Sequence, residues 1–145
     1  MQIIEKETGF QLHKPSAAAI GKFDGIHRGH QSLLRHVLEQ KDKGLQAVVF
    51  TFDPSPAVLF TGTGLPELTT RQEKRKLFAE LGIDVLIEFP LTYESAAMPA
   101  ERFIEEVLAK RMKAAYIAAG GDLSFGKEGK GDTSLLRENA GRCGY

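Results

Sequence analysis

Four short apolar runs, separated by segments with helical spacing, constrain the fold of this chain most strongly. The runs cover residues 17–20, 47–52, 85–89 and 114–119, and the helical segments lie near residues 29–42, 70–82 and 100–112. The runs are nearly continuous rather than alternating, which is typical of strands that are covered on both faces, as in a parallel sheet. Crossovers of this length between such strands predict a doubly wound parallel α/β sheet.

Local signals mark the ends of the predicted helices. Thr70 and Glu73 have the spacing of a capping box at the start of the second helix, and Gly82 is expected to end it. Asp132 is expected to cap a further helix near the end of the chain. Residues 1–16 mix apolar and charged side chains, which favours an edge strand or a hairpin before the core.

Composition narrows the class of protein. With 145 residues and 42% hydrophobic content, the chain is long enough for one domain with a sizeable core. The chain has 19 lysine and arginine residues and 19 aspartate and glutamate residues, so its formal net charge is zero. It therefore lacks the positive net charge that would indicate nucleic acid or an anionic membrane as partner. No apolar stretch approaches the roughly 18 residues of a membrane span, and the start lacks the order of a signal peptide. Cys143 is the only cysteine, which excludes an internal disulfide. We therefore expect a soluble cytoplasmic protein.

The turn after the first apolar run carries the residues that point to chemistry. Gly21, Gly25 and Gly29 allow backbone amides to approach a ligand closely. A helix that begins near Gly29 directs its free N–H groups and positive dipole end towards this turn, which suits an anion. His27 and His30 flank the same point and can donate hydrogen bonds to phosphate oxygens. The turn is therefore predicted to handle phosphate.

Four segments of the chain resemble one family, and one of them is Leu68-Thr69-Thr70 followed by Glu73 and Lys74. The run Gly21-x-Phe23-Asp24-Gly25-x-His27-x-Gly29-His30 resembles the signature of the bacterial FAD synthetases, the FMN adenylyltransferase module of bifunctional riboflavin kinase/FAD synthetases. Its His-x-Gly-His core is similar to the motif of the wider nucleotidyltransferase superfamily. Thr51-Phe52-Asp53-Pro54 is similar to a second family motif, with Ser55 in place of a histidine. Gly120-x-Asp122-Leu123-x-Phe125-Gly126 is similar to the family's segment at the flavin site.

The resemblance implies a Rossmann-like nucleotidyltransferase fold and a reaction that transfers AMP from ATP to FMN, giving FAD and pyrophosphate. Mg²⁺ would accompany ATP, with no metal ligands assigned to the protein. His27 and His30 would be catalytic. The residues that would bind ATP are Gly21, Lys22, Phe23, Asp24, Gly25 and Gly29, and those that would bind FMN are Asp53, Pro54, Asp122, Leu123 and Phe125. ATP and FMN would be the partners, without nucleic acid or membrane.

The resemblance also implies a longer domain. Neither the family's later Ser-Ser-Thr-x-Ile-Arg type motif nor its riboflavin kinase domain has a counterpart within the 145 residues. We expect residues 1–145 to form one nucleotidyltransferase domain that is truncated at its C-terminus, with a kinase domain in the full-length protein. The glycine-rich residues 127–132 are expected to form a mobile flap over the site.

Three alternatives remain open. A nucleotidyltransferase that uses another phosphate acceptor would carry the same His-x-Gly-His turn. A flavin- or nucleotide-binding module would keep the pocket without catalysis. A metal site would instead use Asp24, His27 and His30 as ligands.

Overall fold

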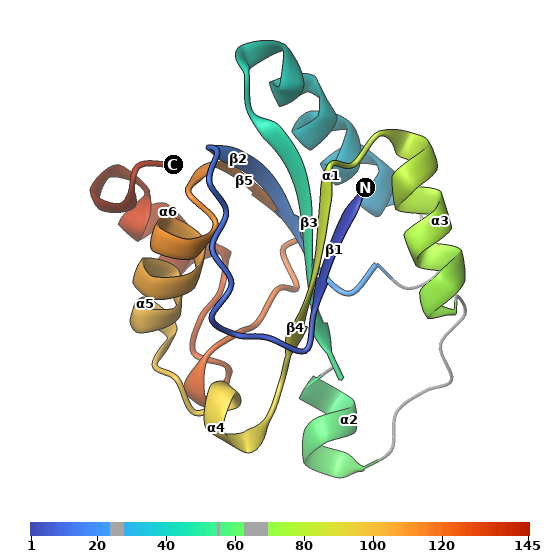
Figure 1. The fold of residues 1–145 in the computed structure, drawn as a ribbon. Coiled ribbons are helices and arrows are strands. Elements are labelled where there is room, and N and C mark those ends of the chain that lie inside the picture. The colour runs from blue at the N-terminus through green and yellow to red at the C-terminus, as the bar shows by residue number, and fades with distance from the viewer. Residues whose placement is uncertain (24–27, 55, 63–69) are drawn as a thin grey trace.

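The computed structural model describes residues 1–23, 28–54, 56–62 and 70–145, and within them five strands form one parallel sheet (Figure 1). The order across the sheet is β1-β4-β3-β2-β5. The strands are β1 (Gln2–Glu5), β2 (Ser16–Ile20), β3 (Gln46–Asp53), β4 (Val85–Pro90) and β5 (Ala114–Ala119). All four predicted runs are strands, and residues 1–16 supply an edge strand, β1, that pairs with β4.

Helices cover both faces of this sheet, as a doubly wound fold requires. Figure 1 shows α1 and α3 on one side of the sheet and α5 and α6 on the other. The helices are α1 (Arg28–Glu39), α2 (Pro56–Thr61), α3 (Arg71–Leu81), α4 (Tyr93–Ala96), α5 (Ala100–Phe103) and α6 (Thr133–Cys143). Two 3₁₀ turns, η1 (Gln40–Lys43) and η3 (Lys127–Gly129), and a π-helical continuation of α5, η2 (Ile104–Arg111), complete the elements. The short helices α2 and α4 are too brief to show a helical period in the sequence.

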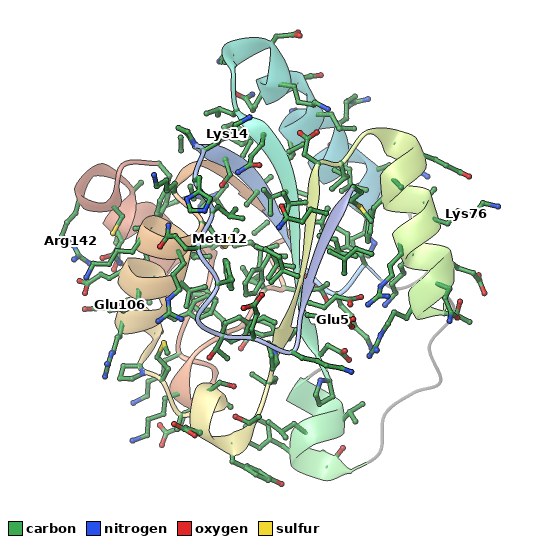
Figure 2. The ribbon with its side chains drawn as sticks, viewed as in Figure 1. Glu5, Lys14, Lys76, Glu106, Met112 and Arg142 are labelled. Atoms are coloured by element: carbon green, nitrogen blue, oxygen red, sulfur yellow. The ribbon has the colours of Figure 1, made fainter. Side chains whose placement is uncertain are left out.

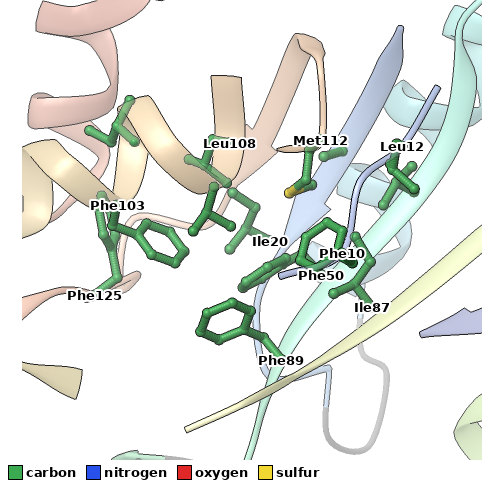
Figure 3. Packing of buried hydrophobic residues seen from close by; sticks show 14 of the residues in the cluster. Phe10, Leu12, Ile20, Phe50, Ile87, Phe89, Phe103, Leu108, Met112 and Phe125 are labelled. Carbon is green, nitrogen blue, oxygen red and sulfur yellow. The ribbon is translucent and has the colours of Figure 1, made fainter. Parts of the chain in front are cut away.

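Alternate residues of each central strand enter different cores, because side chains point to opposite faces of a strand. On β2, Ala18 and Ile20 pack into the cluster beneath α5 and η2, whereas Ala17 and Ala19 pack against α1 and α3. The first cluster is rich in phenylalanine, including Phe50, Phe89 and Phe103 (Figure 3). Both faces of the central strands are therefore buried, which explains their unbroken apolar runs.

The predicted helix ends are present. The Thr70 hydroxyl accepts a hydrogen bond of 3.1 Å from the Glu73 amide, and Gly82 follows α3 in the left-handed conformation. The Asp132 carboxylate accepts a bond of 2.8 Å from the Leu135 amide at the start of α6. Both side chains take up backbone N–H groups that a helix start leaves without intrahelical partners.

The glycine-rich segment after Phe125 makes several hydrogen bonds within itself and to the residues before α5. The Lys127 amide donates to the Met98 carbonyl at 2.8 Å, and Phe125 and Gly131 form an isolated antiparallel bridge. The Ser124 hydroxyl also bonds the Gly129 carbonyl at 3.2 Å. These hydrogen bonds join the segment to the residues before α5 and across its own turn, and the expected mobility of this flap stays a prediction.

Candidate active site

The strand order reverses at β2, whose neighbours are β3 on one side and β5 on the other. The crossovers from β2 to β3 and β4 proceed in one direction, and β5 lies on the opposite side. In open α/β sheets the loops separate at such a point, which leaves a crevice beyond the carboxyl ends of the strands. Segments predicted to carry chemistry follow all three strands, starting at Gly21, Asp53 and Gly120.

A cavity of about 260 Å³ occupies this crevice. Its polar side chains come from Lys22 after β2, His30 in the first turn of α1, and Asp122 after β5. Lys22 and Asp122 are exposed, whereas His30 is half-buried. The remaining lining residues are Ile20, Gly21, Leu33, Phe52, Gly120, Leu123 and Ser124. The cavity therefore joins a lysine, an imidazole and a carboxylate from three elements, and it unites five of the predicted residues: Gly21, Lys22, His30, Asp122 and Leu123.

A second cavity, of about 500 Å³, adjoins the first, since Phe52 and Ser124 line both. Its walls come from α2, α4, α5 and the turn after β5. They comprise Phe52, Phe60, Leu91, Tyr93, Ser95, Ala96, Ala97, Phe103 and residues 124–129. At this cavity Phe60 and Tyr93 are 60% and 68% exposed, with ring centroids 5.9 Å apart. An aromatic, mainly apolar cavity of this kind suits a flat ring system.

Phe23 lies in the core and is not among the described residues that line the cavity, so its predicted role in shaping the ATP pocket stays a prediction. Its ring is fully buried against Phe78 of α3 and the His30 imidazole. Burial of this large apolar ring outweighs exposure at a polar site. Gly21 permits this arrangement, because a Cβ atom there would lie 3.2 Å from the Phe23 ring.

Asp53 and Pro54 are at the same edge of the sheet, yet neither is among the described residues that line the two cavities. The Asp53 carboxylate pairs with the Arg71 guanidinium at the start of α3. Phe125, by contrast, lines the second cavity while its ring packs against Phe103 at 5.3 Å.

Several predicted residues lie outside the described part of the chain. They are Asp24, Gly25 and His27 of the signature turn, together with Ser55 of the second motif. Gly29 belongs to the first turn of α1. Among the described residues, no group of three histidine, cysteine, aspartate or glutamate side chains is arranged to hold a metal ion.

No sequence signal marked two of the lining residues, Phe60 and Tyr93, for the site. Phe60 and Tyr93 belong to α2 and α4, which are too short to be predicted, and their exposure is visible only in the folded chain. An aromatic residue in an apolar run is ordinarily expected to be buried in the core. Only the folded structure shows that such a residue lines a cavity instead.

Comparison with known proteins gives the site a context. A putative bifunctional riboflavin kinase/FMN adenylyltransferase from Geobacillus thermodenitrificans is 36% identical over 140 residues, which cover 96% of this chain and 75% of that protein. The bifunctional riboflavin kinase/FMN adenylyltransferase of Escherichia coli K12 is 35% identical over 128 residues, 87% of this chain. The chain spans only 41% of the length of that relative.

A solved structure supports the fold. The crystal structure of a macrolide-efflux protein from Streptococcus pneumoniae superposes with a TM-score of 0.80 and 26% sequence identity, covering 94% of this chain and 53% of the other. In the described part of the present chain, no helix is both long and apolar enough to cross a membrane.

The family model described as FAD synthetase matches residues 10–145, a range that contains both cavities, the strands β2 to β5 and the His-x-Gly-His turn. The chain therefore belongs to the FAD synthetase family.

Proposed function

We propose that this chain is an FMN adenylyltransferase that transfers AMP from ATP to FMN, releasing pyrophosphate. The observation that carries the proposal is the junction of two unlike cavities at the switch point of the sheet. The smaller one carries a lysine, an imidazole and a carboxylate in its lining, and the larger one is lined mainly by aromatic and other apolar side chains. A nucleotide phosphate chain and a flavin ring differ in the same way, so one cavity suits each substrate.

The smaller cavity is the proposed site for the phosphates of ATP. Lys22 brings a positive charge and His30 brings an N–H donor. α1 is 12 residues long and begins at Arg28, so its first-turn amides add a partial positive charge at the same end. ATP would carry Mg²⁺ with it, and Asp122 supplies one carboxylate in this cavity, which fits the preference of Mg²⁺ for few protein ligands beside substrate phosphates.

The larger cavity is the proposed flavin site. Phe52, Phe60 and Tyr93 offer ring faces and edges on which an isoalloxazine can stack. Because Phe52 and Ser124 line both cavities, a flavin held here would direct its phosphate towards the ATP phosphates. The names of the bifunctional relatives also include riboflavin kinase, an activity whose product is FMN. We propose that FMN reaches this site from such a kinase.

The reaction needs positioning more than covalent catalysis. An FMN phosphate oxygen attacks the α-phosphorus of ATP, the bond from that phosphorus to the α,β-bridging oxygen breaks, and pyrophosphate leaves. Negative charge grows on the phosphate oxygens in the transition state. Donors fixed in advance at that point lower the barrier. His30 and Lys22 are the described side chains placed for this role, and His27 of the same signature is proposed to act with them.

The test is FAD formation from FMN and Mg-ATP by the wild-type chain and two histidine variants. His30→Ala should lower kcat at least about 10²-fold, the cost of losing one transition-state donor. His36→Ala is the matched control, because His36 lies on the same helix but is exposed near its far end, 3.8 Å from Glu39. Equal activity of both variants would remove His30 from the mechanism. A folded wild type that binds FMN without forming FAD would instead favour a binding module.

The alternative of another acceptor is tested in the same assay. The aromatic cavity favours FMN over phosphopantetheine, which has no ring to stack, and over nicotinamide mononucleotide, whose ring is smaller. Phe60→Ala should raise the KM for FMN with little change for ATP, because Phe60 lines only the larger cavity. A preference for either other acceptor would overturn the assignment of flavin to this cavity.

A further inference from the structure

We infer that Phe78 and Phe23 are positioning residues that set the orientation of the His30 imidazole in the smaller cavity. The kinetic part of this inference rests on the proposed function, whereas its structural part does not. Phe78 belongs to α3, outside the signature turn and outside both cavities. Its ring contacts Phe23, whose ring contacts His30.

Three rings form a continuous row from α3 to the cavity. The Phe78 ring meets Phe23 edge-on, with centroids 5.8 Å apart and planes at 86°. The Phe23 ring lies 5.1 Å from the His30 imidazole at an angle of 55°. Both separations fall within the range for favourable aromatic pairs. Phe23 and Phe78 are 0% and 1% exposed, so both rings have fixed surroundings, whereas His30 also borders the open cavity.

The backbone of Phe23 shows that its ring is held in place by its surroundings. Phe23 has a φ angle of 55°, in the left-handed region that bulky residues rarely adopt. Such a conformation persists only where the neighbouring structure compensates for its cost. The compensation comes from burial of the ring against Phe78 and from Gly21, where a Cβ would approach the ring to 3.2 Å. Removing the Phe78 ring would therefore release Phe23 as well.

His30 needs this support because one side of its ring faces the cavity. A side chain in the first turn of a helix can rotate between rotamers, and only one orientation presents a given nitrogen to a phosphate oxygen. A displacement of about 1 Å at a reacting centre can cost about 10²-fold in rate. The buried Phe23 ring restricts the imidazole on its protein side, which keeps the donor aimed before substrate arrives.

Phe78→Leu is the test variant, and Ile83→Ala is its matched control. Each substitution removes three carbon atoms from the same buried cluster, but Ile83 precedes β4 at the opposite end of the sheet from the site. Urea denaturation should show comparable shifts of the midpoint for the two. For FAD formation, Phe78→Leu should lower kcat at least about 10-fold and change the KM for FMN less than twofold. Ile83→Ala should leave kcat within twofold of the wild type.

A second readout does not depend on activity. In the wild type, nuclear Overhauser contacts should join the ring protons of Phe23 and His30, whose centroids are 5.1 Å apart. Phe78→Leu should weaken these contacts and shift the His30 ring resonances, while Ile83→Ala should leave both unchanged. Unchanged His30 resonances in Phe78→Leu would overturn the inference. If the wild type forms no FAD, the proposed function fails, and the resonances alone decide whether the rings position His30.

Discussion

Arg75 of α3 is expected to contribute strongly to stability, because it neutralises a carboxylate that the fold has buried. Its Nε donates to Glu88 Oε2 on β4 at 3.3 Å, and its Nη2 donates to Glu5 Oε2 on β1 at 2.9 Å. Glu88 is 7% exposed, whereas the Arg75 side chain is 24% exposed. The hydrogen bond to Glu88 is the main reason that the pKa of Arg75 is raised.

The change to make is Arg75→Met, which keeps the aliphatic stem and removes the charge. Breaking a buried pair by removing one partner costs about 3–5 kcal/mol, because the other charge stays buried. Water reaches part of Arg75, and the pair with the exposed Glu5 adds at most about 1 kcal/mol. We therefore expect a loss of about 2–3 kcal/mol in the free energy of unfolding, measured by urea denaturation at pH 7.

A control variant and a double variant test whether the loss of stability comes from the buried pair. Lys76→Met is the matched control, since Lys76 follows Arg75 on α3 but projects away from the sheet (Figure 2), is 79% exposed, and lies 4.0 Å from Glu80. It should change stability by less than about 0.5 kcal/mol. Arg75→Met combined with Glu88→Leu should recover most of the loss, because a buried pair replaced by apolar side chains is often neutral. A double variant as unstable as the sum of the single ones, or an Arg75→Met effect as small as that of Lys76→Met, would refute the reasoning.

The remaining predictions concern three other contacts. Gly131→Ala should cost about 1–3 kcal/mol in urea denaturation and weaken FMN binding measured by flavin fluorescence, because its Cβ would lie 2.4 Å from the Phe125 ring; unchanged values would contradict this. Arg71→Ala should change thermal stability by less than about 1 kcal/mol, since both partners of its pair with Asp53 are substantially exposed. Burial raises the pKa of Tyr145 from 10.0 to about 12, so its contribution to stability is present below pH 10 and is lost as pH rises through 12. Tyr145→Phe should remove that part of the pH dependence in chemical denaturation.

The fold was largely predictable because its decisive signals are local in the sequence. Runs buried on both faces read as unbroken apolar segments, and Thr70 and Asp132 cap the helices whose starts they were expected to mark. The crossovers from β2 to β3 and from β3 to β4 join strands that are neighbours in the sheet, as consecutive strands commonly are. The partner of β1 was not predictable, since pairing with β4 joins Gln2 to Val85 across most of the chain.

The site was predictable in part, for a different reason. Lys22, His30 and Asp122 follow strand ends, and parallel strands bring their carboxyl ends to one edge, so their proximity follows from the topology. Phe23 could not be placed in this way. The sequence of a glycine-rich turn does not indicate whether its phenylalanine lines the cavity or packs into the core. Only the close approach of the Phe23 ring to Gly21 in the folded chain shows that it packs into the core.

The helix α3 links these findings. Arg71, Arg75 and Phe78 are spaced by four and three residues, so they lie on one face of the helix. That face contacts the end of β3 through Asp53, the edge pair β1 and β4 through Glu5 and Glu88, and the signature turn through Phe23. The central contact is the buried one, and the helix is anchored there most firmly. Loss of Arg75 should therefore reach His30 through Phe78, lowering kcat for FAD formation beyond what the lost stability explains, while the double variant with Glu88→Leu restores both.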